Sequence, residues 1–199
     1  MRRPEKPMAE TPTAEKPVPP RPGRGAAKAR LDEILRVDHA GELAAVHIYR
    51  GQQAVFAQAP GLEAARDEVA EMGVQEQGHL AAFDAILIER GVRPSLLSPV
   101  WRIAGFALGA ATALMGEKAA HACTEAVESV IEQHYAEQIE ELATREPELA
   151  RTLSGYRDDE LAHRDRAVEQ GAREAPGYGL LSAVIRAGCR VAIRTAEKV

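Results

Sequence analysis

Apolar residues recur every three or four positions along most of the chain, which is the period of an amphipathic α-helix. The first such stripe is expected to begin near Leu31 and to end at the turn signal Pro60-Gly61. The second stripe covers 62–87 and is stopped by the turn residues 91–94. Three further stripes run over 121–142, 149–167 and 180–192. This pattern predicts an all-α protein in which two extra helices accompany a four-helix bundle.

The segment 101–116 departs from this pattern because it is apolar almost all round. It is shorter than the roughly 18 apolar residues that suggest a membrane-spanning helix. Trp101 and Arg102 at one end suit a membrane interface. A buried crossover helix that joins two helical hairpins fits the same composition. The sequence leaves both interpretations open, and both can hold together.

The last helix, expected within 178–196, has an apolar side and a basic side. Arg186, Arg190 and Arg194 fall four apart and therefore form one stripe along a helix. A basic amphipathic helix can lie in an anionic membrane surface, although an ordinary terminal helix with a solvated face shows the same pattern. Together with 101–116, it predicts a peripheral membrane protein that contacts the lipid surface.

Acidic residues and histidines interrupt the apolar stripes at matching points. A Glu-x-x-His pair lies on the second stripe and another on the stripe over 149–167, and each pair shares one helical face. One such pair is a weak signal, but a single Glu also lies about one hairpin upstream of each. This layout, with one Glu from each of two helices and Glu-x-x-His from each of the others, is that of a di-iron carboxylate bundle. The candidate metal ligands, which are also the candidate catalytic residues, are Glu42, Glu76, His79, Glu128, Glu160 and His163.

The ligand types indicate which metal and which chemistry to expect. Carboxylate and imidazole donors suit iron, manganese or zinc. Four carboxylates and two divalent ions are nearly neutral together, which offsets much of the cost of burying the acids. Six ligands leave open positions on two ions for O2 and a substrate. We therefore expect a pair of Fe ions that activates O2 for oxygenation.

Composition narrows the possible classes of protein further. The net charge of −5 argues against a nucleic-acid partner. Cys123 and Cys189 fit no metal or redox spacing and indicate reduced thiols. Residues 1–30 hold most of the 12 prolines and few large apolar residues, so they are expected to be a disordered arm before a domain over 31–199. The arm has neither the apolar core of a secretory signal nor the acid-poor composition of a transit peptide.

Several motifs resemble those of the demethoxyubiquinone hydroxylases of ubiquinone biosynthesis. The resemblance covers about residues 31–196 and includes loops and the apolar segment as well as the Glu and His motifs. Gly78 departs from it, because the family often has Asp there, and Ser129 stands where the family often has an acidic residue. The segments that carry the resemblance are 36–42, 48–52, 92–94, 105–110, 122–124, 157–161 and 187–193.

The resemblance implies a ferritin-like di-iron monooxygenase, peripheral to the cytoplasmic face of the cell inner membrane. It implies O2-dependent hydroxylation of the ring of 5-demethoxyubiquinol, a polyprenyl quinol, in the penultimate step of ubiquinone biosynthesis. It also implies NADH as an electron source and, in some members, a lipid-binding helper protein. The family's ligands fall on the same six Glu and His residues given above.

Residues near the centre are candidates for supporting roles. Asp38 and Asp159 could hydrogen-bond ligand histidines, although Asp38 lies on a face that could equally be solvated. His134 is a candidate proton relay, although a surface or satisfied core histidine is the commoner case. The residues expected to line a quinone or electron-donor pocket are Arg36, Tyr135 and Tyr178.

Two other functions remain open from the sequence. A ferritin-like ferroxidase or iron-binding protein shares the ligand pattern but has no need of two membrane-seeking segments. A catalytically idle helical adaptor on a membrane has no need of four Glu and two His in register on a buried seam.

Overall fold

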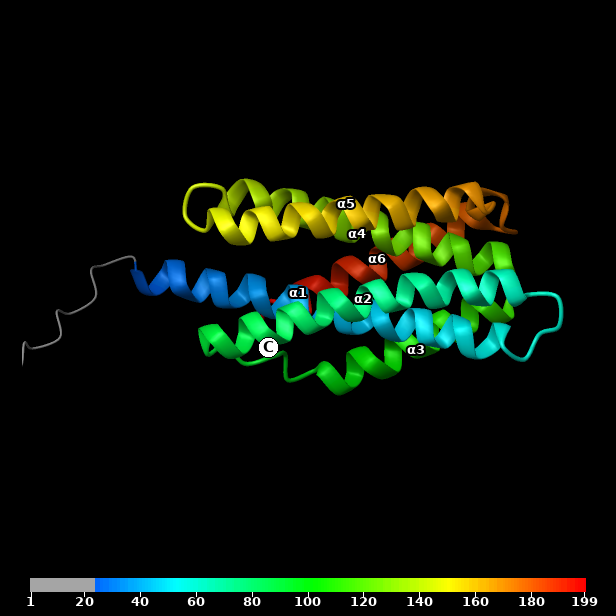
Figure 1. The fold of residues 1–199 in the computed structure, drawn as a ribbon, viewed down its shortest axis with the longest axis horizontal. Helices are drawn as coiled ribbons and strands as arrows, with labels where there is room; N and C mark the ends of the chain where they lie inside the picture. The colour runs from blue at the N-terminus through cyan, green and yellow to red at the C-terminus, as the bar shows by residue number, and fades with distance from the viewer. Residues whose placement is uncertain (1–23) are drawn as a thin grey trace, which may run out of the picture.

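The computed structural model describes residues 24–199, and within this part of the chain it is all-α, as the sequence predicts (Figure 1). The elements are α1 (Arg24–Phe56), α2 (Glu63–Arg90), α3 (Ser98–Leu114), α4 (Glu117–Leu142), α5 (Pro147–Glu169), the short 3-10 helix η1 (Ala172–Glu174) and α6 (Tyr178–Ala196).

The first helix begins earlier than expected. It starts at Arg24 rather than near Leu31, so the last residues of the expected arm form its first turns. The segment 26–30 contains only Ala, Lys and Arg, which are strong helix formers, and no proline lies between Pro22 and Pro60. The remainder of the expected arm, residues 1–23, lies outside the described residues.

Other helix ends fall where the turn signals predict. Gly91 adopts a left-handed conformation with φ 64°, and its N–H faces the carbonyl groups of Ile88 and Leu87 at the end of α2. Pro147 occupies the first turn of α5, where its missing N–H has no partner to lose. These signals set the lengths of the two hairpins, α1–α2 and α4–α5.

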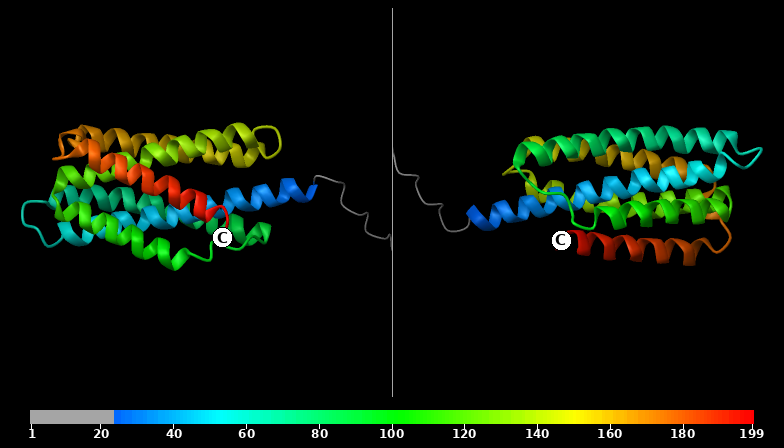
Figure 2. Two further views of the ribbon diagram at one scale, coloured as in Figure 1. Left: turned by 180° about the vertical axis from the view of Figure 1, so that it is seen from behind. Right: turned by 90° about the horizontal axis from the view of Figure 1, so that it is seen from below.

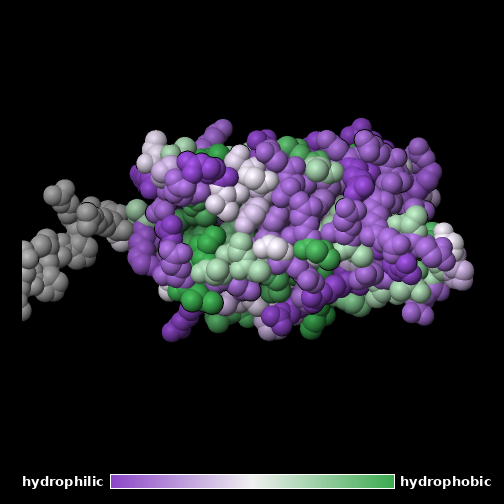
Figure 3. Space-filling view, viewed as in Figure 1, coloured by the Kyte–Doolittle hydropathy of each residue, from purple (hydrophilic) through white to green (hydrophobic). Residues whose placement is uncertain are grey.

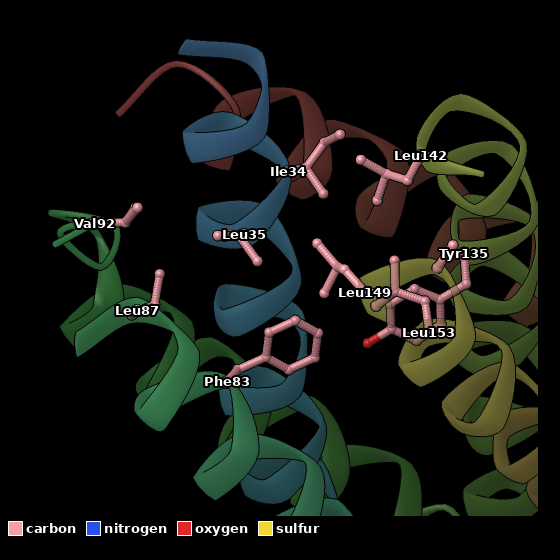
Figure 4. Close-up of a cluster of buried hydrophobic side chains, with 10 residues drawn as sticks. Ile34, Leu35, Phe83, Leu87, Val92, Tyr135, Leu142, Leu149 and Leu153 are labelled. Carbon is pink, nitrogen blue, oxygen red and sulfur yellow. The ribbon is translucent and has the colours of Figure 1, made fainter. Parts of the chain in front are cut away.

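The two hairpins form a four-helix bundle with a long seam between them (Figure 1). One end of the seam is filled by an apolar cluster to which all four helices contribute (Figure 4). A second cluster, which includes Phe56, Val69 and Met72, fills the part of the seam toward the other end of α1. The residues labelled in Figure 4 are Ile34, Leu35, Phe83, Leu87, Val92, Tyr135, Leu142, Leu149 and Leu153.

Helix α3 joins the two hairpins, as the crossover interpretation predicts, but its large side chains are not buried. Gly105 and Gly109 of α3 lie directly against the backbone of α1: a Cβ on Gly109 would come within 2.0 Å of the Ile48 carbonyl oxygen. Glycine allows this close approach because it has no side chain. The larger apolar residues therefore point outward, and Ile103 and Leu114 are 73% and 76% exposed.

Helix α6 packs on α4 and leaves a second set of apolar residues exposed, including Leu180 at 75% and Val184 at 62%. In the right-hand view of Figure 2, α3 and α6 lie along one side of the bundle and α2 and α5 along the other. Figure 3 shows the face over α5 and α2, where hydrophilic residues predominate. Among the described residues, no helix combines the length and hydropathy needed to cross a bilayer.

The expected basic stripe on α6 is only partly free. Arg186 donates two hydrogen bonds, of 2.7 and 2.8 Å, to the carboxylate of Glu125, which is buried on α4. Arg190 and Arg194 instead border a polar cleft together with His134. Arg186 therefore differs from the other two arginines of the stripe, because its side chain compensates a buried carboxylate. The membrane role of the stripe stays a prediction.

Candidate metal centre

The structure brings all six candidate ligands together in the middle of the seam, and each side chain is buried. They form two overlapping groups in which one donor atom per residue lies within 4.8 Å of the others. Glu42 and His79 belong to the first group only, and Glu128 and His163 to the second only. Glu76 and Glu160 belong to both, so they stand between the two positions. The groups are Glu42, Glu76, His79 and Glu160, and Glu76, Glu128, Glu160 and His163.

The helical spacing of the Glu-x-x-His pairs places each imidazole against two carboxylates, at least one of which comes from another helix. The Nδ1 atom of His79 lies 3.5 Å from Glu42 Oε2 and 3.6 Å from Glu160 Oε1. The Nδ1 atom of His163 lies 3.0 Å from Glu76 Oε1 and 3.6 Å from Glu160 Oε2. Both histidines therefore direct the same ring nitrogen into the centre.

The inward-facing atoms have no hydrogen-bond partner, which is the test of whether a cation fits. Both carboxylate oxygens of Glu76, one oxygen of each other Glu, and Nδ1 of each His are buried and unpaired. Buried polar atoms are normally paired, because leaving them without a partner costs about 1–3 kcal/mol each. A divalent cation would satisfy these atoms together, and mixed carboxylate and imidazole donors suit iron or manganese. The residues present therefore fit a two-metal centre.

The pKa values of the ligands in the metal-free centre also favour a metal site. Burial, reinforced by neighbouring carboxylates, raises the pKa of Glu76, Glu128 and Glu160 above the ordinary value. Burial disfavours the charged form of His79, but the nearby carboxylates of Glu160 and Glu42 favour it more strongly and raise its pKa to about 10. Burial lowers the pKa of His163. Without a metal the centre holds protons, and a bound cation must displace them.

Two tyrosines hold the carboxylates that belong to one group only. The Tyr49 hydroxyl on α1 donates to Glu128 Oε1 on α4 at 2.7 Å, and the Tyr135 hydroxyl on α4 donates to Glu42 Oε1 on α1. Each helix thus fixes the acid carried by the other. Tyr135 was expected to line a substrate pocket, and this contact places it inside the centre instead.

The outer nitrogens of the two histidines also have partners. His79 Nε2 lies 3.0 Å from Asp159 Oδ2, which confirms the expected contact between Asp159 and a ligand histidine. His163 Nε2 lies 3.0 Å from Gln75 Oε1, a residue that the sequence reasoning missed. The available signal was its position, because Gln75 precedes Glu76 as Asp159 precedes Glu160.

Asp38 does not contact a ligand histidine. It is buried, as one of the two interpretations of its face predicts, and it accepts a hydrogen bond of 2.7 Å from Gln138 Nε2. His134 lies beside this pair, with its Nε2 3.6 Å from Asp38 Oδ1, and also borders the polar cleft on α6. The role of His134 as a proton relay stays a prediction.

An apolar pocket lies beside the centre, between α1, α4 and α6, with Trp101 of α3 at its edge. Its wall includes Gly41 and Val127, the residues that directly precede Glu42 and Glu128 in the sequence. Arg36, Tyr135 and Tyr178 do not line this pocket. Tyr178 instead packs against a small cluster of buried alanines near η1.

Comparison with known proteins gives one family. The profile of the family described as "Ubiquinone biosynthesis protein COQ7" matches residues 29–196. A 3-demethoxyubiquinol 3-hydroxylase of Rhodospirillum rubrum is 48% identical over 179 residues, which cover 89% of this chain and 82% of the relative. The human mitochondrial NADPH-dependent 3-demethoxyubiquinone 3-hydroxylase is 43% identical over 177 residues, covering 87% and 80%. The mitochondrial 5-demethoxyubiquinone hydroxylase of Saccharomyces cerevisiae is 41% identical over 190 residues, covering 87% and 80%.

Proposed function

Since the chain belongs to the COQ7 family of ubiquinone biosynthesis proteins, we propose that it is a di-iron monooxygenase that hydroxylates the ring of a demethoxyubiquinol. The names of its relatives supply the reaction, a hydroxylation in ubiquinone biosynthesis. The two metal ions, O2 and the long-tailed quinol are our assignment for this chain, and the reaction is the penultimate step of the pathway.

The observation that carries the proposal is the pair of overlapping ligand groups with unpaired buried atoms. Glu42 and His79 would hold one Fe ion and Glu128 and His163 the other, with Glu76 and Glu160 shared. Two Fe ions, when bound, supply the electrons and the binding positions that activate O2. An idle adaptor would not explain why four acids are buried with unpaired carboxylate oxygens at the centre of a bundle.

The chain's own residues prepare the centre for that chemistry. Asp159 and Gln75 accept from the outer nitrogens of His79 and His163, which leaves the inward Nδ1 of each ring free as a donor to metal. Tyr49 and Tyr135 fix the carboxylates of Glu128 and Glu42. The flanking apolar clusters exclude water from both ends of the seam.

The apolar pocket beside the centre suits the substrate. Its lining is small and hydrophobic, and two of its wall residues adjoin Glu42 and Glu128 in the chain. A quinol ring in this pocket would approach the centre from the α1–α4 side. The isoprenoid tail would extend between α3 and α6, where the exposed apolar residues begin.

The exposed faces of α3 and α6 support peripheral attachment to a membrane, and we place the protein on the cytoplasmic face of the cell inner membrane. A ferroxidase or iron-storage protein would share the centre but would have no use for this apolar surface. The electron source is a reduced nicotinamide nucleotide: NADH was expected, and the name of the human relative specifies NADPH. The same apolar surface could receive a lipid-binding helper protein.

The test is a mass-spectrometric quinone profile of host cells that carry Glu160→Ala in the chromosomal copy. The proposal expects a quinone that lacks one methoxy group to accumulate while ubiquinone falls. Glu169→Ala, an exposed acid on the same helix, is the matched control and should leave the profile unchanged. A normal profile in the Glu160→Ala cells would count against the proposed reaction. Loss of iron handling with a normal profile would favour the ferroxidase.

A further inference from the structure

The contacts around the centre repeat with an approximate two-fold relation between the hairpins. Tyr49 of α1 bonds the Glu of α4, and Tyr135 of α4 bonds the Glu of α1. In the same way, the residue before Glu76 on α2 bonds the histidine of α5, and the residue before Glu160 on α5 bonds the histidine of α2. The ligand types in the two halves are identical, so the ligands alone give no reason for the halves to differ.

The relation is broken chemically at the outer partners of the two histidines. His79 has a carboxylate partner, Asp159, at 3.0 Å, whereas His163 has an amide partner, Gln75, at the same distance of 3.0 Å. Equal distances mean that the difference lies in the charge of the acceptor rather than in the geometry of the contact.

A charged acceptor changes the imidazole that it contacts. A hydrogen bond to an ionised group is roughly twice as strong as one between neutral groups. It draws the Nε2 proton toward the acceptor and makes the opposite nitrogen a better donor to metal, so such outer partners change metal affinity by about 10–100-fold. Asp159 is partly exposed, so the lower end of this range applies here. Gln75 fixes the orientation of His163 but adds no charge.

We propose that Asp159 and Gln75 are positioning residues that make the two metal positions unequal, with the position of Glu42 and His79 binding a divalent cation more tightly. This inference rests on the proposed function, because it requires two metal positions. The tighter position keeps its ion when the supply is limiting, and the position of His163 fills second.

Asp38 is another acidic group on the Glu42 side, and its effect on metal affinity must be separated from that of Asp159. Its carboxyl is held by Gln138 rather than by a ligand, and burial raises its pKa, which favours the neutral form. Exchanging the partners of the two histidines leaves Asp38 untouched, so such variants isolate the proposed effect.

The test is a titration of the full metal-free chain with Mn²⁺, followed by equilibrium dialysis and electron paramagnetic resonance. The native protein should bind two ions with dissociation constants about tenfold apart. The first equivalent should give the signal of an isolated ion, and the second should convert it to that of a coupled pair. His163→Ala should keep the tight class, and His79→Ala should lose it.

Variants of the outer partners test the cause. Asp159→Asn should weaken the tight class about tenfold and leave the weak class unchanged, whereas Gln75→Glu should strengthen the weak class. Both changes together should reverse the order in which the positions fill. Asp158→Asn removes the same charge from an exposed neighbour and should change neither class.

Two equal classes in the native protein would overturn this inference and leave the proposed function standing. An Asp159→Asn variant that weakens both classes equally, or only the weaker one, would overturn it as well. A folded native chain that binds no Mn²⁺ or Fe²⁺ would overturn the proposed function together with the inference. Because Gln75→Glu adds an interaction, it keeps the test decisive even where Asp159→Asn fails to fold.

Discussion

The seam of the bundle buries charged residues, and the outer side formed by α3 and α6 exposes hydrophobic ones, so both regions are the opposite of what is usual. The seam buries four carboxylates and two imidazoles, including Glu76 at 1% exposure. The outer side exposes large hydrophobic residues, including Ile103 at 73%. In most soluble proteins charges lie outside and such hydrophobic side chains contribute to the core. Each region therefore needs something that the described chain does not itself provide.

The two regions differ in what would compensate them. A pair of cations would satisfy the seam, because its unpaired atoms fall into two groups of possible ligands. A lipid surface would satisfy the outer side, because its exposed apolar residues are spread along two helices. Different residues form the two regions, so a substitution can alter one region and leave the other intact.

The largest effect should follow from removing one ligand of the seam. Glu128→Ala removes one carboxylate from the metal position of Glu128 and His163. It also opens a void beside Tyr49, whose hydroxyl loses its acceptor. Bound iron should fall to one ion per chain or fewer, and hydroxylase activity should fall at least about 100-fold. Iron analysis and activity on the same preparation check this, with the exposed Glu140→Ala on the same helix as the control. Vesicle binding should not change, and full iron occupancy in Glu128→Ala would contradict the assignment.

Removing the metal should destabilise the protein, and the loss should grow as the pH rises. In the metal-free fold the pKa values of Glu76, Glu128 and Glu160 lie above the ordinary 4.5, so the folded state holds more protons than the unfolded state. This contribution to stability is fully present below about pH 4.5 and is lost as the pH rises through the raised values. The raised pKa of His79, from 6.5 to about 10, acts in the same direction, while the lowered pKa of His163 opposes it near pH 6.

Metal binding has the opposite pH dependence, because the ligands must lose protons to bind. The difference in Tm between loaded and chelator-treated protein should therefore widen from pH 5 to pH 8. At a metal concentration of about 100 Kd the stabilisation is roughly 2.7 kcal/mol per ion, or about 5–10 °C for a domain of this size. Differential scanning calorimetry measures both curves. Parallel curves would show that the centre does not exchange protons for metal.

The seam could be predicted almost fully from the sequence, and the reason is local. Three-residue and seven-residue spacings in a helix fix which side chains share a face, so Glu160 and His163 had to point the same way. The partners of the histidines required knowledge of which helices face each other. Asp159 was predicted and confirmed, but Gln75 was missed because an uncharged side chain gave no reason to look at it.

The outer side was less predictable, because a helical pattern does not show which face finds a partner. The segment 101–116 fitted a buried crossover and a surface helix equally well until the contacts of Gly105 and Gly109 with α1 fixed its orientation. Similarly, the spacing of Arg186 with Arg190 and Arg194 suggested three equivalent residues. Only the packing of α6 on α4 revealed the buried carboxylate of Glu125.

A charge placed on the outer side should weaken membrane binding without affecting the seam. Val184→Glu puts an acid where an exposed apolar side chain of α6 would enter the lipid surface. Burying such a side chain contributes about 1.5–3 kcal/mol, so binding to anionic vesicles should fall about tenfold or more. Val74→Glu is the matched control, because Val74 is 70% exposed on α2, on the opposite side of the bundle. Equal losses for the two variants would argue against α6 as the docking surface.

The smallest effects should separate the arginines of α6. Reversing Arg190 or Arg194 to Glu should weaken vesicle binding about fivefold each, because a basic residue near an anionic surface contributes about 1 kcal/mol. The loss of vesicle binding should be smaller at high salt. Arg151→Glu, at an exposed position on α5, should not weaken vesicle binding.

Arg186→Glu should instead lower Tm, since it leaves the buried Glu125 carboxylate facing another acid. Vesicle sedimentation and thermal melts on the same variants distinguish the two roles. A normal Tm for Arg186→Glu would contradict this structural role and favour a membrane-facing role for Arg186.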